Sequence, residues 1–232
     1  MNPRSFFSRA AQVVFPRFCI GCDDNEPDHP SAFCVDCESL TSPTAHFNHK
    51  DNTLLERVSV RMDIQSGAAL FSFIKGGCIR MAVHRLKYER RPEIGVAFGR
   101  LFGQEMRASP YWIRPDFIIP IPSHYVAEAL RGYNQAERFA VGISATTGVP
   151  VETALLTKSK DIHSQTHKSR EDRFQNVRET LLVNHQDRLE DKTILIVDDV
   201  MTTGATMEAA YSLLSDIPGI RIQLGLIALA HA

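Results

Sequence analysis

Two acidic residues and a threonine-rich turn are neighbours near the end of the chain. Asp198 and Asp199 follow the apolar run 193–197, and the turn 202–206 reads Thr-Thr-Gly-Ala-Thr. Small residues let a backbone approach a phosphate closely, and the unpaired N–H groups at a helix start favour an anion. The two carboxylates repel a phosphate, so they must face another part of the ligand, and the vicinal hydroxyls of a ribose are suitable. The segment therefore predicts a site for a ribose that carries a 5′-phosphate.

Four of the five cysteines have a spacing that is typical of a zinc site. They occur as Cys19-x2-Cys22-x11-Cys34-x2-Cys37, so each pair forms a knuckle that can direct two thiolates at one tetrahedral ion. Four thiolates leave no open position for water, so we expect a structural and not a catalytic zinc. The alternative is two disulfides in a secreted protein. The lack of a signal peptide and the odd fifth cysteine argue against this alternative. That cysteine, Cys78, is expected to be a small buried residue.

The charge around the cysteines bears on what this segment contacts. Residues 18–49 contain no Lys or Arg but six Asp or Glu. Such a segment repels a phosphate backbone, which binds proteins by exchanging its counterions for basic side chains. We therefore interpret it as a docking or protein-contact module.

Length and composition limit the overall class. The 232 residues are 44% hydrophobic and 23% charged with a formal charge of -1, as in ordinary globular proteins. This balance argues against a surface that neutralises nucleic acid as a whole, and no apolar run approaches the roughly 18 residues that span a bilayer. Residues 1–15 have some features of a transit or signal peptide, but the spacing of their apolar residues favours a short helix that docks on the body. We expect a soluble protein.

The elements that must position the acidic pair alternate between strands and helices. The predicted strands cover 68–73, 116–120, 193–197 and 221–230, and the predicted helices cover 77–88, 92–108, 126–142 and 206–214. Such alternation predicts an α/β fold with a mainly parallel sheet and flanking helices. We expect an N-terminal helix and zinc ribbon over 1–45 and the α/β domain over 46–232. The polar stretch 157–176 is expected to be a functional lid or a disordered loop.

The strand, acidic pair and Thr-Thr-Gly turn together resemble the signature of the type I phosphoribosyltransferases. The resemblance implies that Asp198 and Asp199 contact the ribose hydroxyls of 5-phosphoribosyl 1-pyrophosphate (PRPP). It also implies that six residues hold the 5′-phosphate: Met201, Thr202, Thr203, Gly204, Ala205 and Thr206. A receiver-like or flavodoxin-like sheet with an Asp pair at a strand end is the alternative, but it does not account for the turn.

Further motifs narrow the resemblance. Leu-Lys-Tyr-Glu at 86–89, Asp-Phe-Ile-Ile-Pro-Ile-Pro at 116–122 and Arg-Gly-Tyr-Asn-Gln-Ala-Glu at 131–137 resemble the ComF (GntX-like) family, as do Gln165, Arg173 and Asn176. Members of this family join a zinc ribbon to a phosphoribosyltransferase-like domain, are cytoplasmic, and are named for bacterial competence. The resemblance covers nearly the whole chain.

The same resemblance suggests roles for other residues. The turn 120–123 occupies the position of a pyrophosphate loop, in which the amides of Ile121 and Ser123 and the Ser123 hydroxyl would face the diphosphate. Lys158 replaces an expected arginine, and several arginines expected just before Arg131 are missing. A magnesium ion would relieve the repulsion between the diphosphate and the acidic pair. The expected catalytic residues are Asp198, Asp199, Lys158 and Arg173, and the remaining expected substrate contacts are Lys87, Arg131, Gln165 and Asn176.

Three functions remain open at this point. One is an enzyme in which a nucleophile displaces pyrophosphate from PRPP. The second is a non-catalytic accessory protein that senses PRPP and contacts a helicase-like competence protein through the zinc module. The third is an adaptor that binds single-stranded DNA, for which local basic stretches are permissive. Several aromatic residues could stack on bases, although scattered aromatic residues more often belong to a core.

Overall fold

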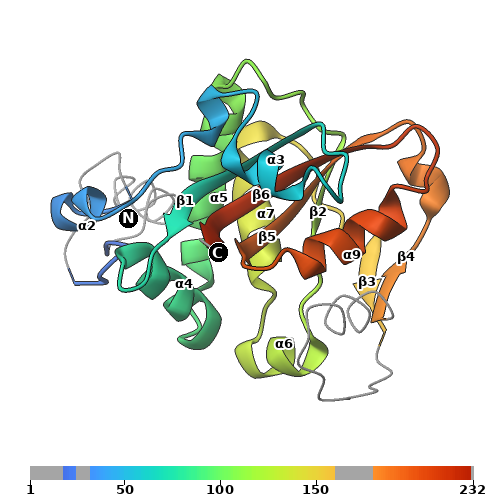
Figure 1. The fold of residues 1–232 in the computed structure, drawn as a ribbon. Helices are drawn as coiled ribbons and strands as arrows, with labels where there is room; N and C mark the ends of the chain where they lie inside the picture. Colours follow the sequence, from blue (N-terminus) through green and yellow to red (C-terminus); the bar gives the residue numbers. More distant parts are fainter. Residues whose placement is uncertain (1–17, 25–31, 160–179, 231–232) are drawn as a thin grey trace, which may run out of the picture.

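A four-stranded parallel sheet forms the centre of the molecule (Figure 1). The computed structural model describes residues 18–24, 32–159 and 180–230. The strand order is β1 (Ser66–Phe73), β6 (Arg221–Ala230), β5 (Thr193–Met201) and β2 (Phe117–Pro120), and each neighbouring pair is parallel. The carboxyl ends of all four strands therefore meet at one edge of the sheet, which is where open α/β folds bind ligands.

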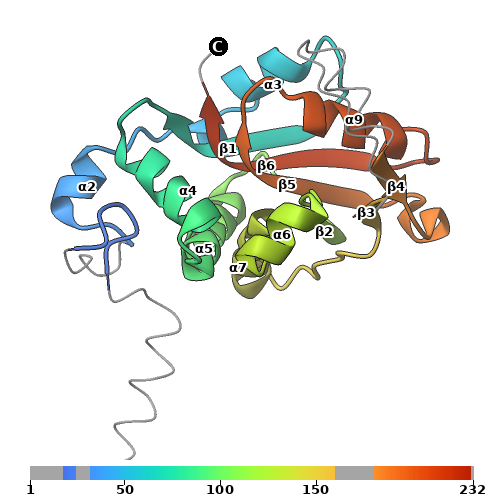
Figure 2. The same cartoon turned by 90° about the horizontal axis from the view of Figure 1, so that it is seen from below.

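Helices cover both faces of this sheet (Figure 2). The helices α4 (Cys78–Tyr88), α5 (Pro92–Ala108) and α7 (Gln135–Thr147) lie on one face, and α3 (Thr53–Val58) and α9 (Ala205–Leu214) lie on the other. Each face of the sheet has its own hydrophobic core. Along β5, Leu195 and Val197 pack into the core on the side of α5 and α7, whereas Ile194 and Ile196 pack into the core on the side of α9. Alternate residues of a strand point to opposite faces, so a continuous apolar run serves both cores.

The pair α5 and α7 packs with its backbones almost in contact. A Cβ atom added to Gly99 would lie 2.1 Å from the carbonyl oxygen of Phe139, and one added to Gly142 would lie 2.2 Å from that of Val96. Only glycine permits such an approach. This contact fixes α7, whose start is one wall of the candidate site described below.

Most of the predicted elements are confirmed, but the single helix predicted over 126–142 is wrong. The chain forms α6 (Tyr125–Arg131), breaks, and continues as α7. Gly132 ends α6 with φ 89°, a left-handed conformation that a helix cannot continue, and the Asn134 side chain then accepts from the Ala136 N–H to cap α7. The structure also contains short elements that were not predicted: α2 (Val35–Ser39), α3, β3 (Leu156–Lys158), β4 (Leu181–Val183) and the 3₁₀ turns at His46–Asn48 and Gln186–Leu189.

The cysteine-containing segment packs against the sheet domain. Phe33 lies edge-on to Phe71 of β1 with ring centroids 5.8 Å apart, and both belong to the core that contains α5. The chain then runs antiparallel to the edge of β1, where Thr44 N–H donates to Leu70 O at 3.1 Å. The division at residue 45 stays a prediction, and the predicted helix within 1–15 lies outside the described residues. Within the described part of the chain, no helix has the length and apolar character needed to cross a membrane.

Candidate functional site

The acidic pair lies at the carboxyl end of β5, within the strand and not after it. Asp198 is half-buried and Asp199 is buried. Each carboxylate accepts the N–H of the following residue at 2.8 Å, so Asp198 bonds Asp199 N–H and Asp199 bonds Val200 N–H. These short local bonds fix the two side chains at the sheet edge. Consecutive strand residues leave on opposite faces, so the two acids cannot have the same surroundings.

A lysine neutralises one of the two acids. Lys87, near the end of α4, has its Nζ 2.7 Å from Asp199 Oδ2. Burial alone would lower the pKa of Lys87, but the charges of Asp199 and Asp198 raise it above its ordinary value. The amine therefore stays charged at the acidic pair. Lys87 is a predicted substrate contact, and in this structure it pairs with Asp199, an acid that is itself predicted to bind substrate.

The other acid has an unusual protonation equilibrium. Burial, together with the negative charge of Asp199, raises the pKa of Asp198 from 3.8 to about 7. Lys158 on β3 is also influenced by this acid, because burial lowers its pKa while the charge of Asp198 opposes that shift. Asp198 thus exchanges its proton near neutral pH, and a cation or hydroxyl donor placed beside it would favour the ionised form.

The turn after β5 has the geometry of an anion site. Thr202 and Thr203 are exposed, and Gly204 has φ 82°, a left-handed conformation that favours glycine. Glu208 N–H donates to Gly204 O at 2.9 Å as the first bond of α9. The amides that precede it in the first turn lack acceptors within the helix, and Ala205 N–H makes only a 3.4 Å contact to Thr203 Oγ1. These amides and hydroxyls can bind a phosphate group.

An arginine that the sequence analysis missed supports this turn. Arg57 of α3 donates from Nη2 to the carbonyl oxygen of Thr202 at 2.6 Å, and its Nη1 donates to the carbonyl oxygen of Ala230 at the end of β6. The guanidinium thereby joins the turn to the neighbouring strand. No motif marks Arg57, because its role depends on contacts with residues more than 140 positions away.

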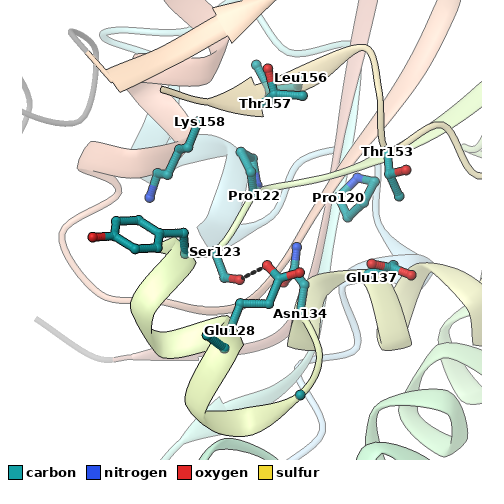
Figure 3. A pocket seen from close by; sticks show the side chains of 13 residues that line it. Pro120, Pro122, Ser123, Glu128, Asn134, Glu137, Thr153, Leu156, Thr157 and Lys158 are labelled. Carbon is teal, nitrogen blue, oxygen red and sulfur yellow. Dashed lines mark hydrogen bonds between the residues drawn. The ribbon is translucent and has the colours of Figure 1, made fainter. Parts of the chain in front are cut away.

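A pocket of about 710 Å³ opens beside the end of β2 (Figure 3). It is bounded by the turn after β2, by α6, by the start of α7 and by β3. Lys158, a predicted catalytic residue, and Ser123, a predicted substrate contact, line it, and so do Glu128, Asn134 and Glu137. The Ser123 hydroxyl donates to Glu128 Oε2 at 2.5 Å, and is thus engaged by an acid in this structure. The acidic pair and the turn at 202–206 are not among the lining residues of this pocket.

The predicted role of the Ile121 amide is wrong for this structure. Ile121 N–H donates to Val197 O at 2.9 Å, because the pairing of β2 with β5 continues one residue beyond the strand. The Ile121 side chain is buried in the core on the side of α9. This amide is therefore not available to a diphosphate.

The Arg-Gly-Tyr-Asn motif ties the α6–α7 junction to the end of α4. Arg131 Nε donates to Lys87 O at 2.7 Å, and the Tyr133 hydroxyl donates to Leu86 O at 2.6 Å. Asn134 Nδ2 donates to Ile121 O at 2.9 Å. The motif that carried the sequence resemblance thus holds the segment around Lys87. Gln165, Arg173 and Asn176, the predicted lid residues, lie outside the described residues.

The four cysteines of the predicted metal site come together. The Sγ atoms of Cys19, Cys22, Cys34 and Cys37 all lie within 4.8 Å of one another. Cys22 Sγ and Cys34 Sγ are 3.9 Å apart, close to the roughly 3.8 Å edge of a tetrahedron with zinc–sulfur bonds of about 2.3 Å. Burial raises the pKa of the Cys19 thiol, and the N–H groups of Gly21 and Cys34, which donate to Cys19 Sγ at 3.3 and 3.2 Å, partly oppose this shift. The cluster could hold a metal ion, and its donor set suits zinc. All five cysteines are free of disulfides.

Comparison with known proteins assigns the fold to a family. The family described as "Phosphoribosyl transferase domain" matches residues 84–228, which is more than half of the chain and includes the acidic pair and the turn. "DNA utilization protein YhgH" of Salmonella typhi is 30% identical over 139 residues, which are 59% of this chain and 60% of that protein. "Competence protein F" of Haemophilus influenzae is 30% identical over 150 residues, which are 63% of this chain and 66% of that protein. The match thus spans about 60% of the length of the first of these relatives.

Two solved structures give weaker likenesses. A glutamine PRPP amidotransferase from B. subtilis has a TM-score of 0.41 at 19% identity and covers 60% of this chain and 30% of its own. An adenine phosphoribosyltransferase from Leishmania tarentolae has a TM-score of 0.37 at 13% identity and covers 82% of this chain and 94% of its own. The chain belongs to the phosphoribosyl transferase family, because the family match covers more than half of it. Within that family it belongs to the ComF group, as the two named relatives and the four-cysteine cluster indicate.

Proposed function

We propose that the protein binds PRPP with magnesium at the carboxyl edge of its sheet. The observation that carries the proposal is the succession of Asp198, Asp199 and the turn 202–206 along one strand end and one helix start. The turn offers amides and hydroxyls to the 5′-phosphate, and the acidic pair accepts from the ribose hydroxyls. The description of the matching family supports this ligand class.

The acidic residues also suit the expected metal. Magnesium in such sites is held by one or two carboxylates together with phosphate oxygens of the substrate. Asp199 is already paired with Lys87, whereas Asp198 is half-buried and exchanges its proton near neutral pH. We propose that Asp198 is the carboxylate that interacts most directly with magnesium, which would neutralise charge on the diphosphate.

The remaining predicted roles complete the proposal. Lys158, which lines the pocket beside β2, and Arg173 would stabilise the departing diphosphate. Zinc in the four-cysteine cluster would be structural, since four thiolates leave no open position. We expect the protein to act in the cytoplasm, a reducing compartment that agrees with five cysteines that form no disulfide. The names of the relatives support a role in competence and DNA utilisation.

Titration calorimetry tests the binding proposal. PRPP is titrated into the protein with and without magnesium, and we expect binding that depends on the metal. Release of pyrophosphate in the presence of a panel of bases and amines then separates a transferase from a protein that only senses PRPP. Absence of any heat or thermal stabilisation with PRPP and magnesium would contradict the proposal.

A further inference from the structure

The helix that carries Lys87 also contacts the four-cysteine cluster. In both overall views α4 lies beside the cysteine-containing segment, to which α2 belongs (Figures 1 and 2). Arg85 is 9% exposed, and its guanidinium donates to Ile20 O at 3.2 Å and to Gly21 O at 2.9 Å. These two carbonyls lie between Cys19 and Cys22, inside the first knuckle.

A second contact joins the helix to the other knuckle. Cys78, at the first position of α4, donates from Sγ to Cys37 O at 3.3 Å. The helix is therefore attached to one knuckle near its start and to the other near its end. This contact assigns a role to Cys78, which is buried as the sequence analysis predicted.

The backbone that Arg85 grips depends on the arrangement of the thiols. A Cβ atom on Gly21 would lie 2.7 Å from Cys37 Sγ and 3.3 Å from Cys19 Sγ, so this backbone lies directly against the cluster. If the thiols separate when the ion is lost, the carbonyls of Ile20 and Gly21 move with them. The acceptors of the buried Arg85 guanidinium would then be displaced, and an unpaired buried charge is strongly unfavourable.

Arg85 is two residues from Lys87 in the last turn of α4. Lys87 Nζ lies 2.7 Å from Asp199 Oδ2, and the carbonyls of Leu86 and Lys87 accept from Tyr133 and Arg131. The last turn of the helix is thus held from three directions: by the cysteine segment, by the α6–α7 junction and by the acidic pair. A displacement of the backbone at Arg85 would change the direction of Lys87, because the two residues belong to the same helical turn.

We propose that the four-cysteine cluster, with its metal bound, positions Lys87 against Asp199 through Arg85. Arg85 is a positioning residue in this proposal, since it touches neither the acidic pair nor the expected ligand. The inference rests on the proposed function for its consequence, which is that metal loss weakens PRPP binding at a distance. The structural part of the inference does not require PRPP.

Chemical labelling of Lys87 tests the structural part. The wild-type protein is treated with a lysine-acetylating reagent before and after removal of the metal by a chelator, and the rate at Lys87 is read by peptide mass spectrometry relative to the exposed Lys50. We expect the relative rate to rise by on the order of tenfold on metal removal, since the amine loses a charge-assisted bond. Arg85→Met should produce the same rise with metal present, and Arg85→Lys a smaller one. Arg80→Met is the matched control, because Arg80 lies on the same helix and is exposed.

The outcomes separate this inference from the proposed function. An unchanged rate at Lys87 in metal-free protein that keeps its α/β circular dichroism would overturn the inference. Loss of the whole circular dichroism signal on metal removal would also overturn it, because the metal would then support the entire fold and not one lysine. PRPP affinity is measured on the same samples, and we expect Arg85→Met to lower it about tenfold while Arg80→Met leaves it unchanged. If the wild-type protein binds no PRPP but the labelling responds, the proposed function fails and the positioning role stands.

Discussion

Lys87 Nζ and Asp199 Oδ2 are 2.7 Å apart, and this ion pair links α4 to the carboxyl edge of β5. The lysine comes from the helix that contacts the cysteine cluster, and the acid comes from the strand that leads into the phosphate turn. The pair therefore connects the four-cysteine cluster with the phosphate turn, the two features for which the sequence predicted ligands. It also leaves Asp198 as the acid whose charge is less compensated.

Removal of Lys87 should lower the stability of the fold, because the buried Asp199 then lacks its ion-pair partner. Lys87→Met leaves Asp199 without its partner, and we expect the free energy of unfolding to fall by about 2 kcal/mol, less than for a fully buried pair because the lysine side chain is 29% exposed. Urea denaturation at pH 8 measures the change. The double variant Lys87→Met, Asp199→Asn should recover most of the stability. A double variant no more stable than the single one would argue against the ion pair.

The stability of the ligand-free protein should depend on the protonation of Asp198. Its pKa is about 7 in the folded protein and 3.8 without the folded surroundings, so the folded state retains a proton between these values. The corresponding stability is present at low pH and is lost as the pH rises through 7. Urea denaturation at pH 5.5 and 8.5 should show a smaller loss in Asp198→Asn than in the wild type. Equal losses in both proteins would contradict the raised pKa, and Asp187→Asn, which changes an exposed acid, serves as control.

The contact between α5 and α7 should not tolerate a methyl group. Gly99→Ala introduces a Cβ atom 2.1 Å from Phe139 O, so the helices must separate, and we expect a loss of about 3 kcal/mol. Gly77→Ala is the control, since the nearest atom to its Cβ would be 3.5 Å away. Thermal denaturation of both variants tests the difference. Equal melting temperatures for the two would show that α5 and α7 are less closely packed than described.

Arg57 should support phosphate binding without touching the phosphate. Arg57→Met removes the donors that hold the carbonyls of Thr202 and Ala230, so the turn becomes less ordered. We expect affinity for PRPP to fall by on the order of tenfold, as for loss of one bond from a charged donor. Calorimetry with PRPP and magnesium measures this, and Arg57→Lys should lose less. Unchanged affinity in Arg57→Met would exclude a supporting role.

The elements around the acidic pair could be predicted because their signals are local. The run 193–197 is apolar and continuous, as a strand covered on both faces requires, and the Thr-Gly turn marks the start of α9. The cysteine spacing predicted the cluster for the same reason, since two knuckles suffice to bring four thiols together. In each case the residues that determine the geometry are neighbours in the chain.

The misses involve contacts between distant segments. One helix was predicted over 126–142 because the left-handed conformation of Gly132 was not foreseen. That conformation depends on where the chain must turn toward α4, which the neighbouring sequence does not show. The Ile121 amide was predicted to be free because nothing in its own turn indicates pairing with Val197. Arg57 and Arg85 bond to backbone carbonyls, and carbonyls carry no sequence signal.

Ligand-induced thermal stabilisation of an acidic-pair variant tests the central claim most directly. The wild type, the double variant Asp198→Asn, Asp199→Asn and the control Asp187→Asn are heated with and without PRPP and magnesium. We predict that the ligand raises the melting temperature of the wild type and the control. The double variant should keep its circular dichroism spectrum and show no rise. A full rise in the double variant would contradict the assignment of the ribose to these two acids.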